Sequence, residues 1–398
     1  MNKQELEKSI ELALIKGEKE QLEILSREAV SVYPEEAFGY AYLAEAILME
    51  FPVPYTKAEY CFVKALQLAP NNTSYMARFA TIKDKQNQGS NAQILWGKIL
   101  TIEPNHLEAL IARGLHLLNN VLDYKQAKEF FDKAIQQYIG HPKNYFYRAI
   151  CYFKLKEYDK ALKDYEYFAQ LRGEQETVEE LLIKAEICRG LNDVDKLVKT
   201  YYAISNLVPN DPFYCTECAH VLLKNEQYKE AAEQYDTALK LTNKTSKRYA
   251  NIAFSLGEVL YKDQQYEAAI DAFEDYVENT ENPIVGLLKQ IDIHLELKQA
   301  QNALNRIKIA QNINADPLYT EQLIKMEGEI LIEIKEYDKA IDVLTPLAEK
   351  LGAYQFESMY LLGKAHFLAN RMQISYQFLH SAALQNQMEA NSFLNKYF

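Results

Sequence analysis

The stretch KAEYCFVKALQLAPNN at residues 57–72 decides the fold, because segments like it recur along the chain. The clearest of these are QAKEFFDKAIQQ (126–137), YDKALKDYEYFAQL (158–171) and YKEAAEQYDTALKL (228–241). In the quoted stretch, Ala58 is followed by Phe62 four residues later and by Ala65 three residues after that. Offsets of four and three place the three side chains on one face of an α-helix. The segments therefore predict a recurring amphipathic helix.

The position held by Ala58, here called the anchor, recurs every 34–38 residues. The anchors are Leu22, Ala58, Ala92, Ala127, Ala161, Leu197, Ala231, Ala269, Ala303, Ala340 and Ser375. A second helical segment precedes each anchor, and a small residue such as Ala149 or Gly257 usually marks its middle. Proline cannot continue a helix. In four units it stands just after the anchor helix, at Pro34, Pro70, Pro104 and Pro209. The period therefore predicts pairs of antiparallel helices.

This pattern resembles the tetratricopeptide repeat, a helix–turn–helix unit of about 34 residues. The best-matching unit contributes Tyr145, Ala149, Tyr152, Ala161, Tyr165 and Phe168. The resemblance covers the whole chain. It implies an all-α fold, a right-handed superhelical α-solenoid of about eleven helix–turn–helix repeats with a C-terminal helix near 388–396. The departures from the family pattern are Ile291 at a small-residue position, Leu197 and Ser375 as anchors, and a polar first helix near 81–91.

We expect one solenoid to span residues 1–398. A single helix pair cannot bury its apolar faces alone, so the repeats must stack on one another. Three longer connections are predicted to be flexible points, at 51–55, 242–248 and 314–320.

The charge balance excludes several classes of partner. The 398 residues contain 56 Asp and Glu but 44 Lys and Arg, for a net charge of −12. Proteins that neutralise phosphates usually carry the opposite excess, so we expect neither nucleic acid nor an anionic membrane surface as a partner. The excess is concentrated in residues 258–342, which hold 18 acidic and 8 basic side chains.

Features of the whole sequence also predict a location. No run of about 18 apolar residues is present, so we expect no transmembrane helix. The N-terminal segment lacks the apolar core of a signal peptide. The chain has 5 Cys, an odd number that indicates a reducing compartment rather than a secreted disulfide framework. We therefore expect a cytoplasmic protein.

The sequence offers little support for catalysis. It contains no GxxxxGK[ST], GxGxxG, HExxH or GxSxG motif. The only CxxC pair, Cys215 and Cys218, lies inside a predicted helix and lacks the second pair that a zinc site normally needs. We interpret both cysteines as apolar packing residues, and we expect no enzyme activity, no metal and no cofactor.

The resemblance implies that the concave surface of the solenoid, lined mainly by the first helices, binds a protein. The leading interpretation is a non-catalytic protein–protein interaction scaffold or adaptor that holds a peptide or partner helix in this groove. The alternative is a peptide-sensing regulatory receptor that changes its superhelical pitch on binding.

Two features are predicted to line the groove. The first is an acidic strip formed by Glu258, Asp292, Glu296, Glu329 and Glu333. The second is a set of aromatic pairs spaced seven residues apart: Phe146 with Phe153, Phe254 with Tyr261, and Tyr360 with Phe367. The strip would favour a basic partner, with aromatic side chains as anchors. The competing interpretations are a solvated charged face for the strip and packing between repeats for the aromatics.

The C-terminal helix leaves two further alternatives open. Phe393, Leu394, Tyr397 and Phe398 are apolar where a capping helix should present a polar outer face. They either cover the last repeat or dock a second copy of the chain, which would give a homo-oligomer.

Overall fold

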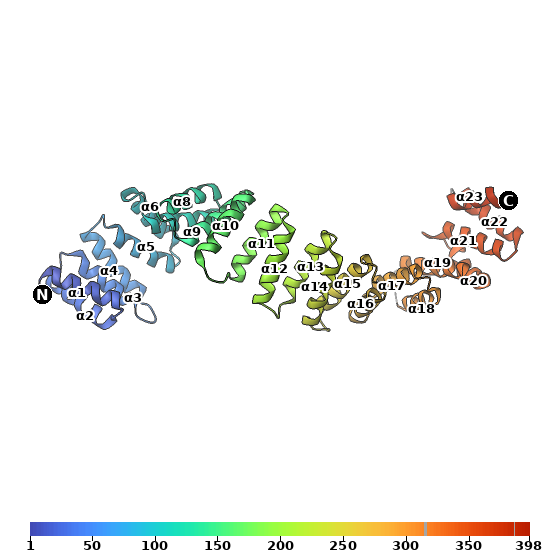
Figure 1. Ribbon diagram of the computed structural model, residues 1–398, viewed down its shortest axis with the longest axis horizontal. Helices are drawn as coiled ribbons and strands as arrows, with labels where there is room; N and C mark the ends of the chain where they lie inside the picture. Colours follow the sequence, from blue (N-terminus) through green and yellow to red (C-terminus); the bar gives the residue numbers. More distant parts are fainter. Residues whose placement is uncertain (314–316, 386) are drawn as a thin grey trace. The chain divides into compact units, whose positions relative to one another are not determined.

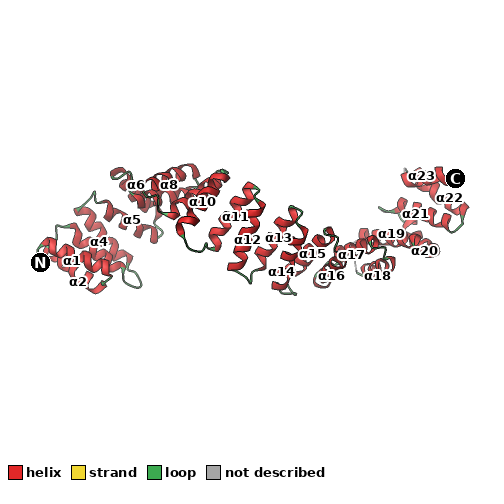
Figure 2. Cartoon of the chain, in the orientation of Figure 1, coloured by secondary structure: helices red, strands yellow, loops and turns green. Residues whose placement is uncertain are grey.

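The computed structural model describes residues 1–313, 317–385 and 387–398 (Figure 1). Every regular element in these ranges is a helix, as the colouring of Figure 2 shows. The all-α, helix–turn–helix prediction is therefore confirmed. Over the described residues there are 23 α-helices and one short π-helix, and the last helix falls at the predicted place. The chain divides into two compact units, 1–197 and 198–398.

The first unit contains the helices up to α11 and the first residues of α12. Their bounds are α1 (Lys3–Lys16), α2 (Lys19–Val32), α3 (Ala37–Leu48), α4 (Tyr55–Leu68), α5 (Thr73–Lys85), α6 (Gly89–Ile102), α7 (Leu107–His116), the π-helix η1 (Leu117–Val121), α8 (Tyr124–Gln137), α9 (Pro142–Lys154), α10 (Tyr158–Arg172), α11 (Val178–Leu191) and α12 (Val194–Leu207).

The second unit contains the rest of α12 and eleven further helices. Their bounds are α13 (Pro212–Lys224), α14 (Tyr228–Leu241), α15 (Lys247–Lys262), α16 (Tyr266–Asn279), α17 (Ile284–Glu296), α18 (Ala300–Gln311), α19 (Pro317–Glu333), α20 (Tyr337–Glu349), α21 (Gln355–Leu368), α22 (Met372–Leu384) and α23 (Met388–Tyr397). Odd-numbered helices up to α21 are the first helices of repeats, and even-numbered helices are the second.

The anchors form the centre of each helix pair. All eleven are buried, including the atypical Leu197 and Ser375. The Ser375 hydroxyl donates a hydrogen bond of 2.8 Å to the Gly363 carbonyl oxygen, which satisfies the one polar anchor. The departures at these two anchors are therefore accommodated without loss of burial.

Where the small residue of a first helix is glycine, it packs against the side chain four residues after the anchor. A Cβ added to Gly257 would lie 2.8 Å from ring atoms of Phe273, and one added to Gly363 would lie 2.6 Å from Leu379. Gly114 stands in the same relation to Phe131. This contact confirms that small residues let the two helices approach closely.

Replacing Gly257 with Ala is therefore expected to lower the free energy of unfolding by about 1–3 kcal/mol, because Phe273 must move to admit the new methyl group. Gly97 provides the matched control, since it also lies inside a helix but has no heavy atom within 4 Å of an added Cβ. Gly97→Ala is expected to stabilise the chain by up to about 1 kcal/mol through helix propensity. Urea unfolding of the two variants should give shifts of opposite sign; a stabilised Gly257→Ala variant would contradict this packing.

The turns between the helices of a pair follow one rule. A residue with positive φ stands five positions before the anchor in ten of the eleven repeats. These residues are Gly17, Asn87, Leu122, Lys156, Asn192, Glu226, Gln264, Lys298, Lys335 and Asn370. The remaining repeat has the longer connection at 51–55 in its place. The left-handed residue lies in the turn between the two helices of a pair, so these ten pairs have the same type of tight turn.

The π-helix η1 results from one extra residue. The small residue and the left-handed turn residue are normally seven positions apart, as between Ala149 and Lys156, but Gly114 and Leu122 are eight apart. A π-turn takes up one more residue than an α-turn. The first helix therefore absorbs the insertion at 117–121 and keeps the turn in register with the anchor Ala127.

The predicted connections differ in what the structure describes. Residues 49–54 join α3 to α4, and the Ser246 side chain caps α15 by accepting a hydrogen bond from the Tyr249 amide. Residues 314–316 lie outside the described residues, and 317–320 begin α19. The single solenoid and its flexible points stay predictions. In the described part of the chain, no helix has both the length and the apolar character needed to cross a bilayer.

Candidate partner-binding surface

Polar contacts join the first helices of neighbouring repeats directly. In the second unit, Lys289 Nζ of α17 lies 2.7 Å from Glu258 Oε1 of α15. Between the same two helices, the Tyr261 hydroxyl donates a hydrogen bond to the Glu296 carboxylate. Successive first helices therefore lie side by side here, and their outward side chains form one continuous surface, called the first-helix surface below.

The same arrangement recurs in the first unit. The Tyr42 hydroxyl of α3 donates to Glu11 of α1 at 3.2 Å, and Arg78 of α5 lies 3.3 Å from Glu45 of α3. Glu11, Glu45 and Glu258 occupy the same position of their repeats. These three carboxylates are each held by a donor from the next first helix.

The five residues of the predicted acidic strip lie in different electrostatic environments. Glu258 is half-buried and paired with Lys289, and Glu329 lies 3.9 Å from Lys325. Asp292, Glu296 and Glu333 are exposed. The structure thus places two lysines among the carboxylates. Sequence reasoning missed them, although Lys289 precedes Asp292 by three residues and Lys325 precedes Glu329 by four, the spacings at which helical side chains meet.

Asp292 is unfavourably placed in the ionised state, and so is Glu329, because desolvation raises the pKa of both carboxyl groups. Although the Asp292 side chain is exposed, the neighbouring helices shield its carboxyl group from part of the solvent, and this desolvation raises its pKa; the like charge of Glu296, four residues along the same helix, raises it further. Lys289 acts in the opposite direction but does not cancel these effects. A carboxyl group with a raised pKa costs stability when it is ionised. An additional cation beside Asp292 and Glu296 would relieve that cost.

The predicted aromatic pairs mostly pack inside the chain. The ring centroid of Phe146 lies 4.8 Å from that of Phe168, Phe153 lies 6.1 Å from Tyr158, and Phe254 lies 5.0 Å from Tyr276. These neighbours belong to the second helices of the same repeats. Packing within each repeat therefore accounts for the three phenylalanines.

Tyr261 is the predicted aromatic residue that meets the acidic strip. Its hydrogen bond to Glu296 raises the pKa of the Tyr261 hydroxyl to about 12, with burial as a second cause. An aromatic ring and two carboxylates, those of Asp292 and Glu296, therefore share one region of the first-helix surface.

The C-terminal helix covers the last aromatic pair. Phe367 contacts Phe393 at 5.2 Å and Tyr397 at 5.1 Å between ring centroids, while Tyr360 lies 6.4 Å from Phe393. The Phe398 ring lies 5.9 Å from that of Phe367, and Leu394 packs in the same cluster. Of the two predicted roles of this helix, covering the last repeat is what the structure shows. Docking of a second copy stays a prediction.

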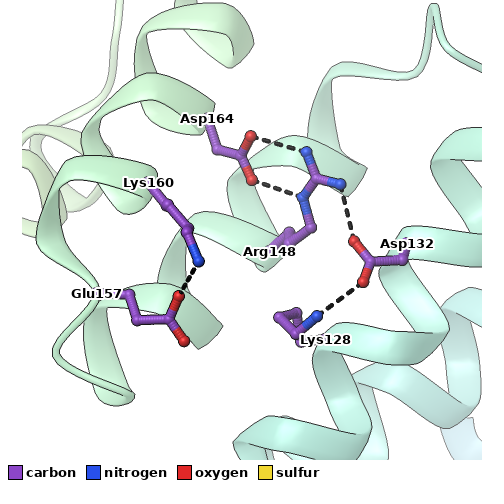
Figure 3. Close-up of polar contacts among 6 residues, drawn as sticks. All are labelled: Lys128, Asp132, Arg148, Glu157, Lys160 and Asp164. Atoms are coloured by element: carbon purple, nitrogen blue, oxygen red, sulfur yellow. Dashed lines mark hydrogen bonds and ion pairs between the residues drawn. The ribbon is translucent and has the colours of Figure 1, made fainter.

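A charge network that the sequence analysis missed lies in the first unit (Figure 3). Arg148 of α9 donates to both carboxylate oxygens of Asp164 on α10, at 2.6 and 2.8 Å, and to Asp132 of α8 at 2.8 Å. Lys128 makes a further contact of 2.9 Å with Asp132. Arg148 thus joins three helices from two repeats. Because Asp132 and Asp164 already neutralise the charge of Arg148, we interpret its role as structural, namely holding neighbouring repeats together.

This network has a counterpart in the second unit at the same repeat positions. Gln290 of α17 donates to Glu274 of α16 at 2.8 Å, and Arg306 of α18 pairs with Glu274 at 2.8 Å. In both places the three residues are spaced sixteen apart in the sequence. The first (Asp132 or Glu274) stands five residues after an anchor, and the second (Arg148 or Gln290) stands one residue before the small-residue position. The third (Asp164 or Arg306) stands three residues after the next anchor. Aligning the repeats would have shown this polar position.

The CxxC pair takes no part in the surface. Cys215 and Cys218 are both buried on α13, and burial raises the pKa of the Cys218 thiol to about 12, with Cys215 as a second cause. A group of three or more His, Cys, Asp or Glu side chains suited to a metal ion does not occur within the described ranges. The two thiols contribute to packing.

Two family models match parts of the chain. A model described as tetratricopeptide repeat matches residues 218–282, which run from α13 to the end of α16 and include Glu258 and Tyr261. A model described as anaphase-promoting complex, cyclosome, subunit 3 matches residues 85–168. Among curated protein sequences, none matches the chain.

Several solved structures are similar to parts or all of the chain. PilF of Pseudomonas aeruginosa is 23% identical with a TM-score of 0.46, over 52% of this chain and 95% of its own. A tetratricopeptide repeat protein from Parabacteroides merdae is 14% identical with a TM-score of 0.41, over 65% of this chain and 98% of its own. Yeast Tom70 is 13% identical with a TM-score of 0.35, over 98% of this chain and 94% of its own.

Proposed function

This chain is a tetratricopeptide repeat protein, and on that premise we propose that it is a non-catalytic scaffold or adaptor for a partner protein. Repeats of this family are protein-interaction modules, and their stacked helices present extended surfaces. The proposed binding region is the first-helix surface of α15, α17 and α19. The partner segment carries Lys or Arg.

One observation carries this proposal, namely the juxtaposition of Asp292, Glu296 and Tyr261. Two carboxylates four residues apart on α17 repel each other, and the partial loss of solvent around the Asp292 carboxyl group adds to the cost of its charge. A Lys or Arg of the partner would lower that cost on binding. The Tyr261 ring offers adjacent apolar area, and aromatic residues of this kind often dominate interface energies.

Asp292→Asn separates binding from stability and is the first test. Because the pKa of Asp292 is raised in the folded chain, its ionised form opposes folding; this cost grows as the pH rises from the ordinary pKa of Asp to the raised one and is complete above it. Thermal unfolding near neutral pH should therefore show that the variant is at least as stable as the native chain. Its affinity for the native partner should fall about tenfold.

The pH dependence of partner binding provides the second readout. Binding of a cationic segment needs Asp292 ionised, so affinity should weaken as the pH falls through the raised pKa of this carboxyl. Isothermal titration calorimetry of the native chain and of Asp292→Asn would compare the two profiles. Glu129→Gln, an exposed change on α8 of the first unit, is the matched control and should keep the native profile. Equal affinities of Asp292→Asn and the native chain would refute the proposal.

The peptide-sensing receptor is the competing hypothesis. It requires a change of superhelical pitch on binding, whereas a scaffold keeps its shape. Small-angle X-ray scattering of the free and the bound chain distinguishes the two hypotheses. A change of pitch would alter the radius of gyration of the repeat array, whereas a scaffold would keep it.

A further inference from the structure

The second helices of the second unit carry a groove that the proposed function does not use. It has a volume of about 460 Å³ and lies over α15, between α14 and α16. Its floor is formed by Leu239, Leu256 and Leu260. Its rim carries the carboxylates Glu233, Asp236, Asp271 and Asp275. We call it the alanine groove, because Ala232, Ala268 and Ala272 line it and their short side chains leave its space unfilled.

The alanine groove is separate from the first-helix surface. Leu256 and Leu260 face the groove from α15, while Glu258 of the same helix pairs with Lys289 on α17. Residues two apart in an α-helix are rotated by about 200°. The two surfaces therefore lie on different sides of α15, and changes in one need not disturb the other.

The corresponding groove further along the chain is smaller and has larger side chains at the alanine positions. The corresponding groove two repeats further along, between α18 and α20, has a smaller volume of about 340 Å³. Counted from the anchors, Leu304 stands there in the place of Ala232, Lys339 in the place of Ala268 and Val343 in the place of Ala272. The same fold thus tolerates filling side chains at all three positions.

The charges of the two grooves also differ. Lys308 stands in the second groove where Asp236 stands in the first. The alanine groove has four carboxylates and one lysine, Lys229, in its lining. Two of the carboxylates have exposed lysine neighbours, with Lys240 2.5 Å from Asp236 and Lys244 4.0 Å from Asp275. Exposed pairs of this kind are weak and exchange readily with a partner's cations.

We propose that the alanine groove is a second docking site, which binds an amphipathic helix of a partner protein. The apolar stripe of that helix rests on Leu239, Leu256 and Leu260, and its flanking Lys or Arg side chains meet the carboxylates of the rim. Amphipathic helices bind by laying their apolar face into a hydrophobic groove. The complementary charge favours a basic helix over an acidic one.

A phage-displayed library of random peptides of about 15 residues, enough for about four helical turns, is the probe. Selection on the full chain should recover peptides with apolar residues at i, i+3 or i+4 and i+7, flanked by Lys or Arg. Their affinities for the full chain and its variants can be measured by fluorescence polarisation. Selection that yields no basic amphipathic peptides would overturn the proposal.

Groove-filling variants copied from the neighbouring groove provide the decisive comparison. A232L, A268K and A272V together reproduce the side chains found two repeats further along, so the helices are expected to keep their packing, which circular dichroism would verify. The selected peptides should bind this variant at least about tenfold more weakly. Asp236→Lys with Asp271→Lys leaves the alanines in place and should have a similar effect through charge. Unchanged binding to both variants would overturn the proposal.

The control is a reversal on the other side of α15. Asp292→Lys with Glu296→Lys should leave the selected peptides bound, because neither residue lines the alanine groove. Loss of peptide binding in this control would place the peptides on the first-helix surface and contradict a second site. The result is independent of the proposed function, which is tested with the native partner and the first-helix variants.

Discussion

Replacing Arg148 with Met is expected to lower the free energy of unfolding by about 3 kcal/mol. Arg148 is the cation shared by Asp132 and Asp164, and the Asp164 side chain is only 10% exposed. Removing one partner from a buried ion pair leaves an uncompensated charge and typically costs about 3–5 kcal/mol. The lower end of that range applies because 19% of the Arg148 side chain is open to solvent. Urea unfolding measures the change.

Lys160→Met is the matched control in the same region. Lys160 pairs with Glu157 at 2.6 Å, but 65% of its side chain is exposed. Figure 3 shows this pair beside the Arg148 network. Its removal should leave the unfolding midpoint unchanged. Arg148→Lys should recover only part of the native stability, because an ammonium group cannot donate two parallel hydrogen bonds to Asp164. Equal stability of Arg148→Met and Lys160→Met would contradict the assigned role.

Reversing Asp292 and Glu296 to Lys is expected to weaken binding of the native partner about 100-fold, which corresponds to about 2.7 kcal/mol. The change removes two attractive contacts and places two like charges opposite the partner's cations. Both side chains are exposed on α17, so the fold should be retained. Surface plasmon resonance at two salt concentrations would measure affinity and association rate.

A control with the same change in net charge excludes a general electrostatic effect. Glu20→Lys with Glu129→Lys reverses two exposed carboxylates on second helices of the first unit. This variant should bind almost as tightly as the native chain. If both double variants lose affinity equally, the whole-chain charge rather than the first-helix surface attracts the partner.

The fold could be predicted in detail because its determinants are local and repeated. Most anchors, such as Ala58, are small and recur every 34–38 residues, so each copy supports the others. Gly257 and Gly363 could be recognised as close-contact positions because they align with alanines in other repeats. The π-helix was not predicted, although the extra residue between Gly114 and Leu122 is visible once the turns are aligned.

The site could be predicted only in part, because charge compensation depends on neighbours in space. The acidic residues of the strip repeat along the sequence, but Lys289 on α17 forms an ion pair with Glu258 on the neighbouring first helix α15 and neutralises its charge. Phe146 and Phe254 follow a seven-residue spacing that suits both a groove and a core, and both are half-buried against Phe168 and Tyr276 of their own repeats. Arg148 shares no motif with its partners, so its network becomes apparent only when the repeats are compared.

Hydrogen–deuterium exchange of the chain with and without its native partner tests the central claim most directly. The partner can be obtained by affinity capture and identified by mass spectrometry, and the exchange measurement then locates its footprint. We predict slower exchange in peptides of α15 and α17 that contain Tyr261, Asp292 and Glu296, and unchanged exchange in α8 and α10. Protection confined to other helices, with α15 and α17 exchanging as in the free chain, would contradict binding at the first-helix surface.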